Sequence, residues 1–129
     1  MSERTTEVLV LGIGNVLWAD EGFGVRAVEA LHAGWVFPEA VRLIDGGTLG
    51  LELLDEVASA RRLLVFDAID RGLAPGTLAV LRGSDVRGWG ARRLSPHQNG
   101  LHDVLALAVL HGSAPEAVTA IGVQPVTLE

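Results

Sequence analysis

The 129-residue chain contains no cysteine and no lysine. The lack of cysteine excludes disulfides, thiolate catalysis and cysteine-ligated zinc sites. All ten residues counted as Lys or Arg are arginine. The chain can therefore have neither a Schiff-base lysine nor a P-loop lysine. Its longest apolar run lies around residues 104–110 and is far shorter than the roughly 20 residues that span a bilayer. We therefore expect no association with a membrane.

Acidic residues outnumber basic ones by 16 to 10, which gives a formal net charge of -6. A nucleic-acid partner is unexpected, because phosphate contacts require a basic face. Hydrophobic residues make up 49% of the chain, which is enough for one domain with its own core. The polar residues 1–7 lead directly into an apolar run, so we expect no signal peptide and a cytoplasmic protein. At this size we expect a monomer.

Strand-like and helix-like patterns alternate along the chain. Apolar runs typical of buried strands occur at residues 7–13, 41–44, 63–66, 77–81 and 118–123. Patterns typical of helices occur at residues 23–33, 51–60 and 101–110. This alternation predicts a single α/β domain with a mixed, mostly parallel, five-stranded twisted sheet and helices on both faces.

The fourth strand is predicted to run antiparallel. Its link to the third strand, residues 68–76, contains a Pro75-Gly76 turn and is shorter than the dozen or so residues of a parallel crossover. After the fifth strand, a doubly wound domain normally has a covering helix, and the sequence has none. We therefore expect that the domain at residues 1–129 lacks a C-terminal helical segment, or that a partner covers the exposed face.

The segment after the first strand is the most informative part of the chain. Gly12 and Gly14 are expected to form a tight exit from the strand, as in a dinucleotide-binding domain. The third glycine of that fingerprint is missing, and Asp20 and Glu21 follow instead. Two carboxylates would repel a phosphate and attract a cation. The segment therefore favours a metal site over a nucleotide-binding module.

Other polar residues follow the second and third strands or lie in the long loop at residues 82–100. Because ligands of an open α/β sheet bind beyond the carboxyl ends of its strands, we expect these side chains to converge. They are Asp45, Asp67, Asp70 and His97. Carboxylate and imidazole together suit a divalent transition metal such as zinc or nickel.

Structural roles are the alternative for several of these residues. Asp20 could cap the following helix, with Glu21 in its first turn. Asp45 precedes two glycines and suits a turn, and a backbone group could satisfy His97. Asp67 differs from them, because it ends an apolar strand, where a buried carboxylate needs a partner.

Over almost its whole length the chain resembles the hydrogenase maturation proteases. The motifs that carry the resemblance are residues 12–15 (GIGN) with 20–26 (DEGFGVR), 45–48 (DGGT), 66–68 (FDA), 75–77 (PGT), 95–98 (SPHQ) and 122–125 (GVQP). The first motif resembles the branch that serves membrane-bound uptake hydrogenases.

The resemblance implies a nickel-dependent endopeptidase. Such proteins remove a C-terminal peptide from the large-subunit precursor of a nickel–iron hydrogenase after nickel has been inserted. By motif matching, Glu21, Asp67 and His97 would contact the nickel and carry catalysis. From their positions alone, Asp20 and Asp45 are expected to support these three residues. The nickel would arrive held by cysteines of the precursor, so the free protease is expected to bind it weakly or not at all.

Other functions remain open from the sequence. The main alternative is a maturation chaperone that docks the nickel-loaded large subunit without cutting it. A stand-alone zinc hydrolase is a further alternative, and it would hold its metal tightly.

Overall fold

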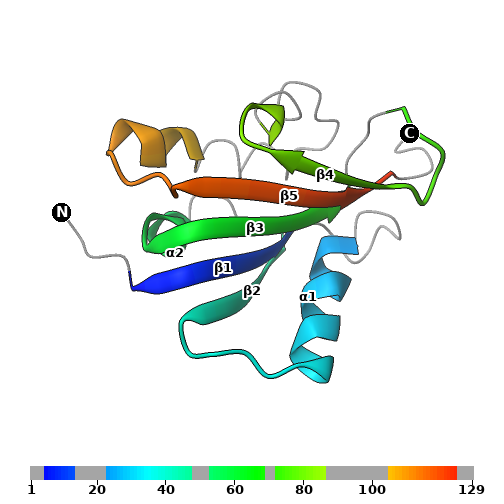
Figure 1. The fold of residues 1–129 in the computed structure, drawn as a ribbon, viewed down its shortest axis with the longest axis horizontal. Coiled ribbons are helices and arrows are strands. Elements are labelled where there is room, and N and C mark those ends of the chain that lie inside the picture. Colours follow the sequence, from blue (N-terminus) through cyan, green and yellow to red (C-terminus); the bar gives the residue numbers. More distant parts are fainter. Residues whose placement is uncertain (1–4, 14–22, 48–52, 69–71, 87–104, 125–129) are drawn as a thin grey trace.

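The computed structural model describes residues 5–13, 23–47, 53–68, 72–86 and 105–124. In these residues five strands form one sheet in the order β2-β1-β3-β5-β4 (Figure 1). In chain order the elements are β1 (Thr6–Ile13), α1 (Phe23–Gly34), β2 (Val41–Gly47), α2 (Leu54–Ala58), β3 (Ala60–Ala68), β4 (Leu78–Arg82) and β5 (Ala117–Val123). Residues 105–110 are also helical. Among the described residues, no helix is long and apolar enough to cross a membrane.

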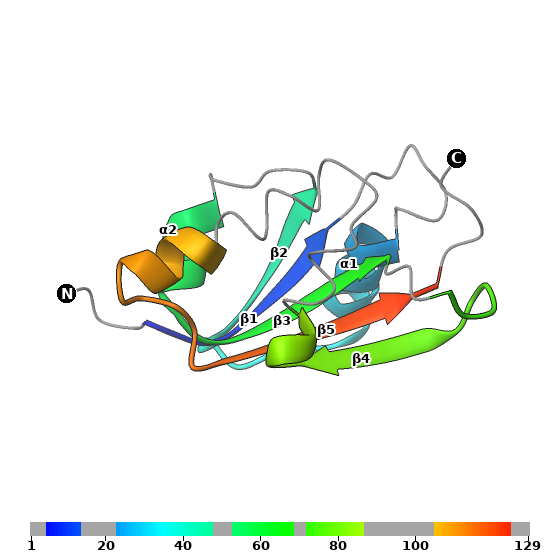
Figure 2. The same cartoon turned by 90° about the horizontal axis from the view of Figure 1, so that it is seen from above.

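The strand directions confirm the predicted mixed sheet. β1, β2, β3 and β5 run parallel, whereas β4 runs antiparallel to β5. The strands fan across the sheet as it twists (Figure 2). β4 does not pair with β3, although it follows β3 in the chain, because β5 lies between them. Ala68 of β3 pairs with Val123 of β5, and Val123 pairs in turn with Leu78 of β4.

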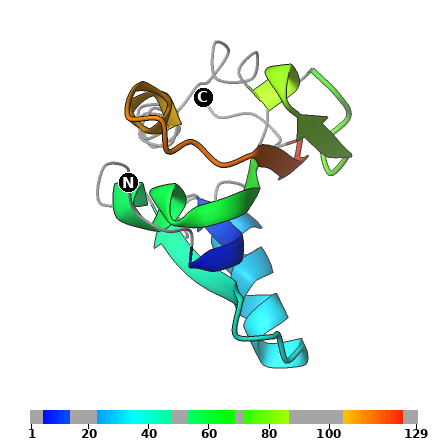
Figure 3. The same ribbon diagram turned by 60° about the vertical axis from the view of Figure 1, so that its left-hand side comes forward.

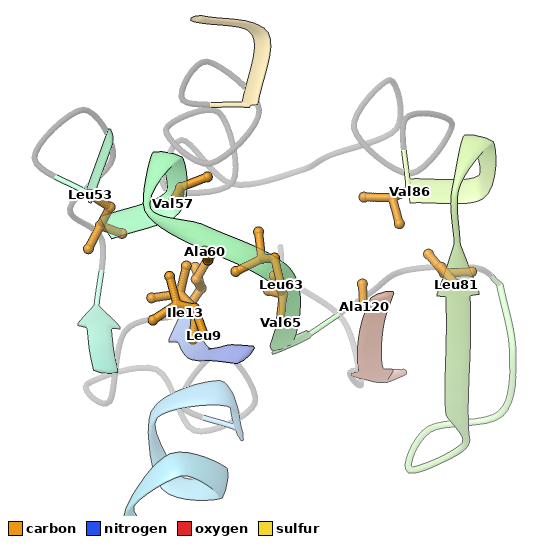
Figure 4. Close-up of a cluster of buried hydrophobic side chains, with 11 residues drawn as sticks. Leu9, Ile13, Leu53, Val57, Ala60, Leu63, Val65, Leu81, Val86 and Ala120 are labelled. Atoms are coloured by element: carbon orange, nitrogen blue, oxygen red, sulfur yellow. The ribbon is translucent and has the colours of Figure 1, made fainter. Parts of the chain in front are cut away.

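Helices cover both faces of the sheet, as predicted. α1 packs against β1, β2 and β3 on one face, and α2 lies on the other (Figure 3). Successive side chains of a strand point to opposite faces, so Leu9 and Leu11 of β1 share the α2 face with Leu63 and Val65 of β3. These side chains form the main core together with Val57 of α2 (Figure 4).

The predicted end of the second helix is wrong, and strand pairing explains the difference. The amphipathic pattern predicts a helix over residues 51–60, but α2 ends at Ala58 and β3 begins at Ala60. Ala60 pairs with Thr6 of β1, and the Thr6 N–H donates to the Ser59 carbonyl oxygen at 3.1 Å. Pairing with β1 therefore takes precedence over the local helical pattern.

The α1 face of the sheet also carries a hollow of about 310 Å³. Its lining includes Val8, Arg62, Leu64, Val80, Arg82 and Ile121. No helix of the described ranges covers this hollow, and 49% of Val80 is exposed. The idea that a C-terminal helical segment or a partner covers this face stays a prediction.

Two glycines allow α1 to lie directly on the sheet. A Cβ atom at Gly24 would collide with the carbonyl oxygens of Ile13, the last residue of β1, and Phe66, two residues before the end of β3. A Cβ atom at Gly12 would collide with the carbonyl oxygen of Gly24 and lie 2.7 Å from Cγ2 of Val28. The backbones of β1 and α1 therefore meet without any side chain between them.

The reason for Gly12 differs from the expected one. Gly12 lies inside β1, where it pairs with Asp45 of β2 and with Phe66 of β3, and it does not form the exit from the strand. Positive φ angles occur among the described glycines only at residues 72, 76, 83 and 112. Close packing, and not an unusual backbone angle, therefore requires Gly12, while Gly14 lies outside the described residues.

We expect the Gly24→Ala substitution to lower the free energy of unfolding by about 3 kcal/mol or more, because backbone carbonyls cannot move aside for the methyl group. Gly34→Ala is the matched control at the other end of α1, where an added Cβ would meet nothing within 4 Å. The control should leave stability unchanged or raise it by up to about 1 kcal/mol through helix propensity. Urea denaturation measures both values, and equal stabilities of the two variants would contradict the close approach.

Candidate functional site

Asp67 occupies the centre of the carboxyl edge of the sheet. It lies near the end of β3, the middle strand, and is 0% exposed. Its Oδ1 accepts a hydrogen bond from the N–H of Ala68 at 2.8 Å. A buried carboxylate is costly unless it is hydrogen-bonded or bound to a cation. A carboxylate kept at this position therefore favours a functional role.

The flanking strands fix the position of Asp67. β1 pairs with β3 on one side, and β5 pairs with it on the other, where Asp67 lies opposite Gly122. Strand alternation places the Asp67 side chain on the α2 face, with Leu63 and Val65. The carboxylate thus comes from a strand held on both sides, and not from a loop.

An aromatic contact joins the start of α1 to the end of β3. The rings of Phe23 and Phe66 meet edge to face, with centroids 6.3 Å apart and planes at 68°. Phe66 directly precedes Asp67, and Phe23 follows Glu21 by two residues. The chain therefore enters α1 beside the strand end that carries the buried carboxylate.

Asp45 does not converge with Asp67. It lies inside β2, which extends to Gly47 and so beyond the predicted residues 41–44. Asp45 pairs with Gly12, and Gly12 pairs with Phe66. Because paired residues share a face, Asp45 belongs to the α1 face, whereas Asp67 points to the opposite one. The register therefore keeps Asp45 and Asp67 on different faces, and the expected support of the site by Asp45 stays a prediction, because Glu21 and His97 lie outside the described residues.

The other predicted site residues lie outside the described residues. They are Asp20, Glu21, Asp70 and His97. Within the described ranges, no three His, Asp or Glu side chains form a group that could hold a metal. Three residues were predicted to contact nickel. Of these, the described ranges include Asp67, whereas Glu21 and His97 lie outside them.

Gln124 was not predicted as a site residue, although it belongs to the GVQP motif. It follows β5 directly and is 6% exposed. Its side-chain Oε1 accepts a hydrogen bond from the Leu73 N–H at 3.2 Å. Its main chain bonds the same turn, because the Gly76 N–H donates to the Gln124 carbonyl at 2.9 Å and the Gln124 N–H donates to the Thr77 carbonyl at 2.8 Å. The only sequence signal for this role was the motif itself.

Comparison with known families identifies the family of this chain. The family model described as hydrogenase maturation protease matches residues 25–129. The chain belongs to the hydrogenase maturation protease family. The resemblance seen in the motifs is therefore confirmed.

Curated relatives of this protease family agree with the assignment. The chain is 55% identical over 130 residues to the hydrogenase expression/formation protein HupM of Azotobacter chroococcum, covering 100% of this chain and 62% of that protein. It is 57% identical to HoxM of Azotobacter vinelandii, covering 95% of this chain and 59% of HoxM. The hydrogenase 2 maturation protease of Escherichia coli is 45% identical, with coverages of 95% and 75%. The chain spans about three-fifths of the length of the first two relatives.

Solved structures of maturation proteases share the fold. The hydrogenase maturating endopeptidase HybD from E. coli superposes with a TM-score of 0.90 at 44% identity, covering 96% of this chain and 77% of that one. HybD from Thermococcus kodakarensis gives a TM-score of 0.71 at 26% identity, with coverages of 92% and 80%. The α/β architecture is therefore that of the family.

The hydrogen bond at Asp67 predicts different effects of two substitutions on stability. Asp67→Ala removes the oxygen that accepts the Ala68 N–H, so we expect a loss of about 1–3 kcal/mol. Asp67→Asn keeps an acceptor of the same shape and removes a buried charge, so its stability should lie within about 1 kcal/mol of the parent. Thermal denaturation followed by circular dichroism measures the difference. If the asparagine variant lost as much as the alanine variant, the carboxylate would have a structural role that an amide cannot fill.

Proposed function

We propose that the protein is a nickel-dependent endopeptidase that removes the C-terminal peptide from the large-subunit precursor of a nickel–iron hydrogenase after nickel insertion. The proposal rests on one observation, a fully buried Asp67 at the carboxyl edge of a maturation-protease fold. A relative at 45% identity bears the name hydrogenase 2 maturation protease, which supports the same reaction for this chain.

The donor set suits nickel that arrives with the substrate. Glu21, Asp67 and His97 offer two carboxylates and an imidazole, and imidazole in particular suits nickel. The chain contains no cysteine, so thiolate ligands would have to come from the precursor. Such a site would recognise the metal only together with the protein that carries it, and it would leave coordination positions free for that protein.

The proposed reaction is hydrolysis of one peptide bond. A water molecule attacks the scissile carbonyl carbon while a carboxylate accepts its proton, and that proton then passes to the leaving amine. Glu21 and Asp67 are the two candidates for this general base. Nickel held by the precursor would polarise the scissile carbonyl or the attacking water.

The nickel requirement is tested on the precursor itself. Nickel-loaded and nickel-free large-subunit precursors are incubated with the protein, and their masses are followed by mass spectrometry. We expect release of the C-terminal peptide from the loaded precursor only, because the three proposed ligands bind the substrate's metal. Binding without any change in mass would indicate a maturation chaperone, and equal cleavage of both precursors would contradict nickel dependence.

Three substitutions test the site residues. We expect Glu21→Gln, Asp67→Asn and His97→Ala each to slow precursor processing by about 100-fold or more, the range for loss of a general base or a metal contact. Asp55→Asn and His111→Ala are matched controls on exposed residues and should process at the parent rate. The assignment fails for any of the three residues whose substitution leaves the rate unchanged.

A further inference from the structure

Gly122 lies beside Asp67 on the same face of the sheet. Asp67 of β3 is opposite Gly122 of β5, and Ala79 of β4 is opposite Gly122 on its other side. Because paired residues share a face, all three positions belong to the α2 face. Next to the buried carboxylate, β5 therefore contributes no side chain.

The side chains that β5 and β4 place on the α2 face become smaller towards the carboxyl edge of the sheet. In this direction they are Val118, Ala120 and Gly122 in β5, and Leu81 and Ala79 in β4. The other neighbour of β3 differs, because β1 ends in Ile13, a large and buried member of the main core (Figure 4). The small residues are thus confined to one side of Asp67.

The backbone of β5 does not require glycine at this position. The described glycines with a positive φ do not include Gly122, so its φ is one that any residue adopts. The register of β5 with both neighbours is uninterrupted through Gly122, so no bulge lies there. Among the described elements, β5 packs extensively only on β3 and β4, and α1 does not lie on Gly122 as it lies on Gly12.

A glycine inside a strand weakens the strand, and it often marks a place where a ligand comes close. With neighbouring strands about 4.8 Å apart, a side chain at residue 122 would project directly beside the Asp67 carboxylate. Asp67 is 0% exposed, so a substrate group that contacts it has to fit between the side chains of the flanking strands. Ile13 fills the β1 side, whereas Gly122 leaves the β5 side free of any side chain.

We infer that Gly122 is a specificity-determining residue of the proposed reaction, which keeps room beside Asp67 for the precursor segment that contains the scissile bond. This role rests on the proposed function, because it takes Asp67 as a contact of the substrate. A larger residue at position 122 would hold the scissile bond away from the carboxylate and leave the carboxylate itself in place, since β1 and β5 still pair with β3.

Gly122→Ala and Gly122→Val test this role. We expect kcat/KM for the nickel-loaded precursor to fall by about tenfold or more with alanine and about 100-fold or more with valine, because a displacement of about 1 Å at a reaction centre can cost about 100-fold. Alanine is also better than glycine inside a strand, so the melting temperature of Gly122→Ala should rise by about 2–5 °C. Lower activity together with higher stability separates room for a substrate from a structural role.

Two control variants add bulk elsewhere. Ala117→Val adds two methyl groups to the same strand but on the α1 face, where Ala117 is exposed, and it should leave kcat/KM unchanged. Ala79→Val adds the same groups on the α2 face, one strand farther from Asp67 than Gly122. It should lower kcat/KM less than Gly122→Val does.

The outcomes distinguish the role of Gly122 from the proposed function. If the parent chain cleaves the loaded precursor and both Gly122 variants keep its kcat/KM, the role of Gly122 is wrong and the proposed function stands. A fall of more than about 5 °C in the melting temperature of Gly122→Ala would mean that the chain itself fills this space, and it also overturns the role. So does an equal loss of kcat/KM in Ala117→Val. If the parent chain does not cleave the loaded precursor, the proposed function fails, and the role of Gly122 fails with it.

Discussion

The close approach of Gly12 and Gly24 is the contact on which the rest of the structure depends. A Cβ atom at either position would overlap backbone atoms of the neighbouring element, so any larger residue would push α1 away from β1 and β3. The same contact brings Phe23 to within 6.3 Å of Phe66, measured between ring centroids. One backbone-to-backbone contact therefore sets where the chain enters α1 relative to the strand that carries Asp67.

The sheet supplies the second constraint, the burial of Asp67 in its central strand. β1 and β5 pair with β3 on its two sides, so the backbone beside the carboxylate is held by two ladders of hydrogen bonds. A group on such a rigid element keeps its position better than one on a loop. In the proposed function, this fixed donor would meet a metal that the substrate carries.

Much of the fold could be predicted from the sequence, because long apolar runs identify buried strands directly. The five strands, the reversed β4 and the helices on both faces were all predicted from such runs and from the short link with its Pro-Gly turn. The boundaries were less predictable. The end of α2 and the extension of β2 depend on pairing with β1, and a local hydrophobic pattern contains no information about a partner strand. For the same reason, the sequence did not show that Asp45 and Asp67 lie on different faces.

The sequence by itself determined the α/β class, the family and the candidate residues Glu21, Asp67 and His97, because hydrophobic periodicity and ordered motifs are properties of the chain alone. Only the tertiary structure decided which side chains share a face of the sheet. It separated Asp45 from Asp67, joined Gln124 to the turn at residues 72–77, and showed that Gly12 serves close packing. These relations depend on strand register and on contacts between segments far apart in the chain, which a local pattern cannot specify.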